Sequence, residues 1–61
     1  MTSREIVEIL ERDGWFSIGQ TGSHRKFRHP TKPGLIVVPM HAGKGLGKGL
    51  EHSILKKAGL K

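Results

Sequence analysis

The sequence contains no cysteine, and its longest apolar run covers only residues 35–40. The absence of cysteine excludes a disulfide framework, a thiolate zinc site and a cysteine nucleophile, and it fits a reducing compartment. The short apolar run excludes a membrane-spanning helix, because crossing a bilayer takes roughly 20 apolar residues. No charged-then-apolar leader opens the chain. We therefore expect a soluble cytoplasmic protein with no membrane partner.

The chain is also short, at 61 residues of which 34% are apolar. We expect a single domain over residues 1–61 with a thin core, because a chain of this size buries only about 60% of the surface that it exposes when unfolded. A deep, enclosed active-site cavity is not expected. The protein is predicted to work through its surface and to gain stability from a partner.

Acidic residues are nearly absent after residue 13. The first 13 residues hold four acids and two bases, whereas the other 48 residues hold nine bases and a single acid, Glu51. The formal net charge of +6 is therefore concentrated in one part of the chain. A field of that sign attracts polyanions such as phosphate backbones. A lysine-rich surface kept for solubility is the alternative, and charge alone does not separate RNA from DNA or from an acidic protein.

The pattern of apolar and turn-forming residues predicts the order helix, strand, strand, strand, helix. A capping box at Thr2 and Glu5 begins the first helix, which ends before Gly14. The later segments are predicted as strands at 15–18, 24–29 and 35–38, a turn at 20–23, a loop at 40–49 and a last helix at 50–58. We expect an α+β protein with a three-stranded antiparallel sheet, both helices on one face and the other face open to solvent.

Alternation along the second strand divides its side chains between two faces, His24, Lys26 and Arg28 on one and Arg25, Phe27 and His29 on the other. Because Phe27 marks the buried face, His24 is expected to point outward beside two cations. Trp15 and Phe27 are assigned to the core rather than to base stacking. His29 and His52 are interpreted as structural or incidental.

The glycine-rich segment does not have P-loop spacing, so mononucleotide binding is not predicted. Gly43-Lys44 and Gly47-Lys48 nevertheless put lysines and free amides near the start of a helix, which suits one phosphate of a polymer. A loop that needs glycine only to turn is the alternative. The four histidines lack the spacing and the companion ligands of a metal site, and nearby cations repel a metal ion, so neither a metal nor a cofactor is expected.

His24 is the strongest candidate for chemistry. RNA supplies its own nucleophile, the 2′-hydroxyl, so cleaving it takes little more than one histidine to transfer a proton and cations to stabilise charge on the phosphate. An outward histidine at the start of a basic strand fits that need. His41, directly after the third strand, is the next candidate. A surface histidine with no chemical role is the alternative for both.

Three short blocks carry a family resemblance: G-S-H-x-x-F at 22–27, V-P-x-H-x-G-K at 38–44 and I-L-K-x-A-G-L at 54–60. In this order and at this spacing, between residues 22 and 60, the blocks resemble the HicA family of toxins. The resemblance implies a fold like that of double-stranded-RNA-binding domains. It also implies an mRNA interferase, a ribonuclease that arrests translation until a HicB antitoxin binds it.

The resemblance assigns the catalytic role to His24, as general base or general acid. Together with the basic pattern, it gives a predicted RNA-binding set of Gly22, Ser23, Lys26, Arg28, His41, Lys44 and Lys48. Two other functions stay open: a non-catalytic RNA-binding module that uses the same basic face, and an inactive scaffold whose only partner is its antitoxin.

Overall fold

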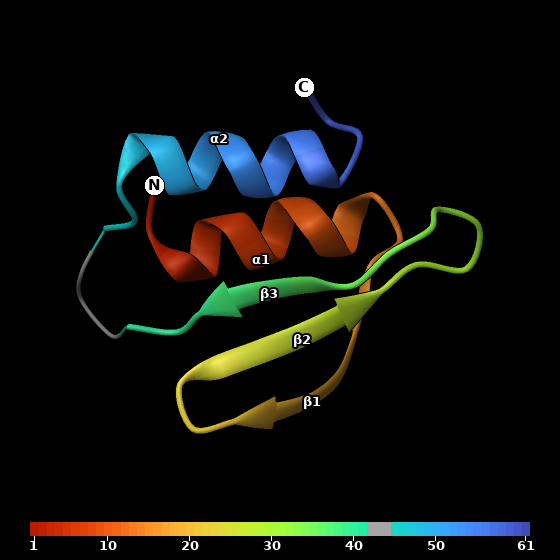
Figure 1. Ribbon diagram of the computed structural model, residues 1–61, viewed down its shortest axis with the longest axis horizontal. Coiled ribbons are helices and arrows are strands. Elements are labelled where there is room, and N and C mark those ends of the chain that lie inside the picture. Colours follow the sequence, from red (N-terminus) through yellow and green to blue (C-terminus); the bar gives the residue numbers. More distant parts are fainter. Residues whose placement is uncertain (42–44) are drawn as a thin grey trace.

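A computed structural model describes residues 1–41 and 45–61. Its elements are α1 (Ser3–Arg12), β1 (Phe16–Thr21), β2 (His24–Arg28), β3 (Ile36–Pro39) and α2 (Lys48–Lys57), as Figure 1 shows. The strands form one antiparallel sheet in the order β1-β2-β3. The predicted α+β class and the α-β-β-β-α order of a double-stranded-RNA-binding-domain-like fold are confirmed.

Helix α1 begins at the predicted capping box. The Thr2 hydroxyl accepts from the Glu5 backbone N–H at 3.2 Å, and the Glu5 carboxylate accepts from the Thr2 N–H at 2.8 Å, so two otherwise unpaired amides are satisfied. The helix ends as expected before Gly14, which adopts a φ of +104°. These local signals therefore set both ends of α1.

Strand β1 is longer than the sequence indicates. The residues assigned to a turn include Gln20 and Thr21, but both pair with β2, and the turn contains only Gly22 and Ser23. An irregularity in the register between Ser17 and Gly19 shifts the pairing by one residue and lets the strand continue. Pairing with a neighbouring strand thus overrides the turn preference of the polar residues.

Helix α2 begins at Lys48, so the expectation of a loop over 40–49 is wrong at Lys48 and Gly49. Contacts with the other end of the chain hold this start in place. The Leu46 N–H donates to the Met1 carbonyl at 2.7 Å, and the amino group of Met1 donates to Glu51 in the first turn of α2. Such tertiary contacts offset the poor helix propensity of glycine, which costs about 1 kcal/mol.

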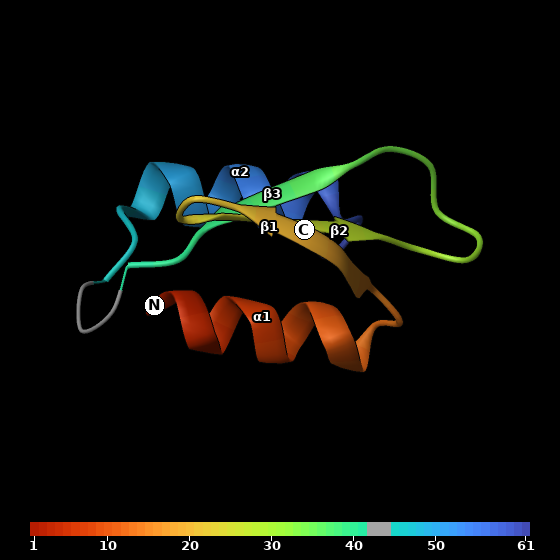
Figure 2. The ribbon, with the colours of Figure 1, turned by 90° about the horizontal axis from the view of Figure 1, so that it is seen from below.

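One apolar cluster joins the two helices to a single face of the sheet. Its members are Ile6, Val7, Leu10, Trp15, Phe27, Ile36, Val38, Leu46, Ile54, Leu55 and Ala58. Figure 2 shows α1 over one side of the sheet, and Figure 1 shows α2 beside α1, beyond β3. Trp15 and Phe27 are buried, as predicted. Within residues 1–41 and 45–61, no helix is long and apolar enough to cross a bilayer.

A polar cluster ties together the ends of both helices. The Lys32 ammonium donates to the Asp13 carboxylate and, at 2.9 Å, to the Ala58 carbonyl at the end of α2. His29 lies against the Trp15 ring and bonds the Asp13 carbonyl through Nε2 at 2.6 Å. His29 therefore has the structural role expected for it.

Candidate active site and nucleic-acid interface

His24 is the first residue of β2 and is exposed to solvent. It pairs with Thr21 on one side and with Pro39 on the other, so strands flank its backbone on both sides. The imidazole is therefore carried by the middle strand of the sheet while its ring stays accessible. That combination of a rigid backbone and an open side chain suits a group that must meet a large substrate.

A tight turn directly precedes His24. Gly22 has a φ of +58°, whereas Ser23 has a negative φ, which is the pattern of a type II′ hairpin turn with glycine in the first central position. An alanine at position 22 would meet no neighbour, so glycine is needed here for its backbone conformation. Gly22 and Ser23 therefore have a structural role in the turn, beside the RNA contact predicted for them.

Hydrogen bonds fix the corner of the sheet at which His24 and His41 lie. The Met40 N–H donates to the Ser23 carbonyl at 2.6 Å. The buried Ser3 hydroxyl donates to the Pro39 carbonyl at 2.6 Å and accepts from the His41 N–H at 3.3 Å. The first residue of α1 thus holds the segment that carries His41. Sequence reasoning missed Ser3, since its partners are 36 and 38 residues away and no local pattern marks it.

Lys26 and Arg28 follow His24 on the same face of β2, while Arg25 lies on the face of Phe27, as the alternation predicts. The Arg25 guanidinium carbon is 5.8 Å from the centroid of the Phe27 ring, and its Nε donates to Ser17. Lys26 is half-buried and Arg28 is exposed. Three nitrogen-bearing side chains therefore share one face of the middle strand.

The strands contain no carboxylate at all. The five acids lie in α1, at its C-terminal cap and in α2, and three of them are held by partners near those helices. A hydrogen bond from the Thr2 backbone lowers the pKa of Glu5, one from Lys32 lowers that of Asp13, and one from the amino terminus lowers that of Glu51. Among the described residues, no carboxylate forms an ion pair with a cation of the sheet. The open face therefore keeps a positive charge.

Comparison with known proteins identifies the family. The family model described as HicA toxin of bacterial toxin-antitoxin systems matches residues 3–60. The chain belongs to the HicA toxin family. A chain in a toxin–antitoxin complex from Streptococcus pneumoniae is 34% identical to it and superimposes with a TM-score of 0.82, and the match covers 98% of each chain. No curated protein matches.

In this HicA chain the predicted RNA-binding residues come from several elements. Figure 1 shows the β1–β2 turn, the end of β3 and the beginning of α2 at the same end of the molecule. Lys48, the first residue of α2, is exposed at that end. Lys44 lies outside the described residues. The fold thus brings His24 and the start of α2 to one end, although Lys48 lies 24 positions after His24 in the sequence.

The four histidines of this HicA chain do not form a single cluster. His24 begins β2, His29 lies in the polar cluster at the opposite end, His41 follows β3 and His52 is exposed on α2. Within the parts of the chain that the structure describes, no three side chains of metal-ligand type gather.

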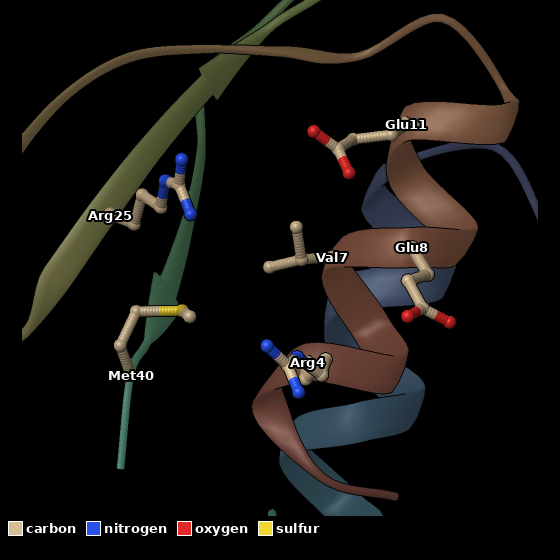
Figure 3. A pocket seen from close by; sticks show the side chains of 6 residues that line it. All are labelled: Arg4, Val7, Glu8, Glu11, Arg25 and Met40. Atoms are coloured by element: carbon tan, nitrogen blue, oxygen red, sulfur yellow. The ribbon is translucent and has the colours of Figure 1, made fainter. Parts of the chain in front are cut away.

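A cleft of about 290 Å³ lies on the other side of the sheet, between α1 and β2. Its lining combines two cations, two acids and two apolar side chains: Arg4, Val7, Glu8, Glu11, Arg25 and Met40. Figure 3 shows Arg25 and Met40 across the cleft from Val7. Because Arg25 points away from the face of His24, this cleft is separate from the candidate active site.

Proposed function

We propose that this HicA toxin is an endoribonuclease in which His24 transfers protons during cleavage of mRNA. The observation that supports the proposal most directly is an exposed imidazole on a sheet whose strands carry cations and no acids. Degraded mRNA cannot be translated, so this activity arrests protein synthesis, and its place of action is the cytoplasm.

The proposed chemistry needs only the RNA, the side chains of the chain and water. The 2′-oxygen attacks the adjacent phosphorus and loses its proton as the new P–O bond forms. The bond from phosphorus to the 5′-oxygen breaks, and that oxygen receives a proton, which leaves a 2′,3′-cyclic phosphate and a 5′-hydroxyl. His24 takes the first proton or supplies the second, and solvent water exchanges the other. Lys26 and Arg28 stabilise the charge that develops on the phosphate oxygens.

The remaining members of the predicted set bind the RNA backbone. Lys44 and Lys48 are proposed to contact phosphates on the strand as it leaves the sheet, with His41 beside the site. Backbone amides of the Gly22-Ser23 turn are proposed to contribute further contacts.

The test of this function compares two exposed histidines. We expect His24→Ala to lower the rate of RNA cleavage by about 10²- to 10⁴-fold, the usual contribution of a general acid or base, and to abolish growth arrest. The matched control, His52→Ala, removes an exposed histidine of α2 and should cleave at the wild-type rate. Purified protein, single-stranded RNA and a chelator suffice, with thermal unfolding to verify that both variants fold.

The other outcomes separate the alternatives. Cleavage by His24→Ala at the original rate contradicts the proposed role of the imidazole. RNA that the wild-type protein binds but leaves intact favours a non-catalytic RNA-binding module. A protein that neither binds nor cleaves RNA favours the scaffold whose only partner is an antitoxin.

We also propose a HicB-like antitoxin as the protein partner. The match to a chain in a toxin–antitoxin complex supports this partner, as does a basic face that an acidic or occluding protein can cover. Binding to the folded state alone would also raise the stability of this small domain. Co-expression with the product of an adjacent small gene should give a complex that no longer cleaves RNA.

A further inference from the structure

One aromatic side chain of this protein is exposed. The chain has three aromatic residues, of which Trp15 and Phe27 are buried in the core, whereas 48% of Phe16 is accessible. A phenyl ring forms no hydrogen bond with water, so leaving half of one exposed gives up stabilisation that burial supplies. The ring is therefore available to a ligand.

The register of the sheet places Phe16 on the face of His24. Phe16 pairs with Arg28, and Arg28 shares a face of β2 with Lys26 and His24. Paired side chains have Cβ atoms about 5 Å apart, so the phenyl ring and the guanidinium are neighbours. His24 lies four residues earlier in β2, which at about 3.3 Å per residue is about 13 Å away.

The surface between Phe16 and His24 is open to solvent. Gly19 lies opposite Lys26, and an added Cβ there would meet nothing within 4 Å. Val37 pairs with Lys26 from the other side and is 40% exposed. Figures 1 and 2 show no helix over this face of β1 and β2 among the described residues. A flexible strand can therefore lie along it.

We propose that Phe16 stacks on a base of the bound RNA and so positions the strand over His24. This inference rests on the proposed RNA-binding function and adds a positioning residue to it. At about 3.4 Å per stacked nucleotide, the separation of about 13 Å puts the stacked base within about four nucleotides of the scissile bond. Arg28 contacts the phosphate beside that base.

Charge and the exposed ring together favour a single-stranded nucleic acid over a second copy of the chain on this face. Lys26 and Arg28 attract a phosphate backbone, and Arg28 is the cross-strand partner of Phe16. Cations and an aromatic ring on one face are the combination used by surfaces that bind single strands. A second copy of the chain would bring the same cations against one another. From the sequence, only Trp15 and Phe27 were considered for base stacking. Phe16 was missed because burial decides which aromatic ring is accessible, and burial is a tertiary property.

Binding to an RNA that cannot be cut tests the proposal. The probe is a short, labelled, single-stranded oligonucleotide with 2′-O-methyl riboses, which lack the nucleophile. We expect Phe16→Leu, which keeps an apolar side chain but loses the aromatic face, to weaken binding about 5- to 150-fold. Phe16→Trp should bind at least as well as the wild type. Leu50→Ala, at an apolar side chain of α2 that is 44% exposed, should have no effect.

A second measurement identifies the stacked base without changing the protein. A single abasic nucleotide is moved along the same probe, and the wild-type protein should lose affinity strongly at one position. In Phe16→Leu that loss should disappear, because the ring that the base contacts is gone. The wild-type result stands even if Phe16→Leu unfolds.

Several results would overturn the stacking proposal. The first is that Phe16→Leu binds the probe with wild-type affinity, and the second is that the wild type loses affinity equally at every abasic position. The third is that Phe16→Leu loses affinity only for a HicB-like protein, which would assign the ring to a protein interface. The proposed catalysis is tested separately: if the wild type fails to cleave ordinary RNA while Phe16→Leu still weakens probe binding, the nuclease function fails and the stacking role stands.

Discussion

At the residue scale, Gly14 lies between α1 and β1, next to the imidazole of His29. Its φ of +104° is strained for any other residue, and an added Cβ would come within 2.9 Å of His29 Nε2. We expect Gly14→Ala to lower the free energy of unfolding by about 1–3 kcal/mol from backbone strain alone. The displaced ring should add to that loss by weakening the bond from Nε2 to the Asp13 carbonyl.

The matched control is Gly34→Ala. Gly34 has a similar φ of +93°, but an added Cβ there meets nothing within 4 Å. The difference between the two variants in chemical denaturation therefore measures the contact with His29. Equal destabilisation of the two variants would show that the His29 ring moves aside without an energetic cost.

At the scale of elements, the polar cluster around Asp13 joins the end of α1, the loop after β2 and the end of α2. His29 Nδ1 accepts from the backbone N–H groups of Thr31 and Lys32, so Nε2 carries the proton and donates to the Asp13 carbonyl. Lys32 meets the carboxylate of Asp13 and the last turn of α2. The cluster therefore holds together the ends of two helices that lie far from His24.

This cluster predicts an acid-sensitive contribution to stability. The hydrogen bond from Lys32 lowers the pKa of Asp13 from its ordinary value of 3.8 in the folded protein. The contribution is therefore fully present above about pH 3.8 and is lost as the pH falls through the lower folded pKa. Denaturation of the wild type and of Asp13→Asn between pH 6 and pH 2, a range of about four units around that value, should show the two stabilities converging in acid. A constant difference would contradict the prediction.

At the scale of the whole molecule, the acids are confined to the helices and the cap of α1, whereas the sheet carries cations only. The open sheet face therefore attracts polyanions without competition from nearby carboxylates. If the four predicted phosphate contacts of Lys26, Arg28, Lys44 and Lys48 all form, the logarithm of RNA affinity should fall with that of salt concentration with a slope of about −2.8.

Removing part of the predicted interface tests that slope. In the double variant with Lys26→Ala and Arg28→Ala, only two predicted phosphate contacts remain, so the slope should change to about −1.4. Lys56→Ala and Lys57→Ala remove two exposed lysines from the last turn of α2, at the other end of the helix from Lys48, and should leave it unchanged. Binding that does not depend on salt would contradict the electrostatic interface.

Local patterns in the sequence were sufficient to determine several features of the fold. The capping box begins α1, Gly14 ends it, and the alternation around Phe27 turns His24, Lys26 and Arg28 to the open face, because each of these features depends on residues within one turn or one strand. The candidate site could be proposed for the same reason, since the Gly22-Ser23 turn and the histidine that follows it are adjacent in sequence.

Only the tertiary structure decided the rest. The extension of β1 through Thr21 depends on its pairing with β2, and the start of α2 at Lys48 depends on contacts with Met1. The bonds from Ser3 to the segment of His41 and the exposure of Phe16 likewise arise from residues far apart along the chain. Hydrogen bonds and burial between distant segments leave no mark on any short stretch of sequence, so they emerge only when the chain is folded.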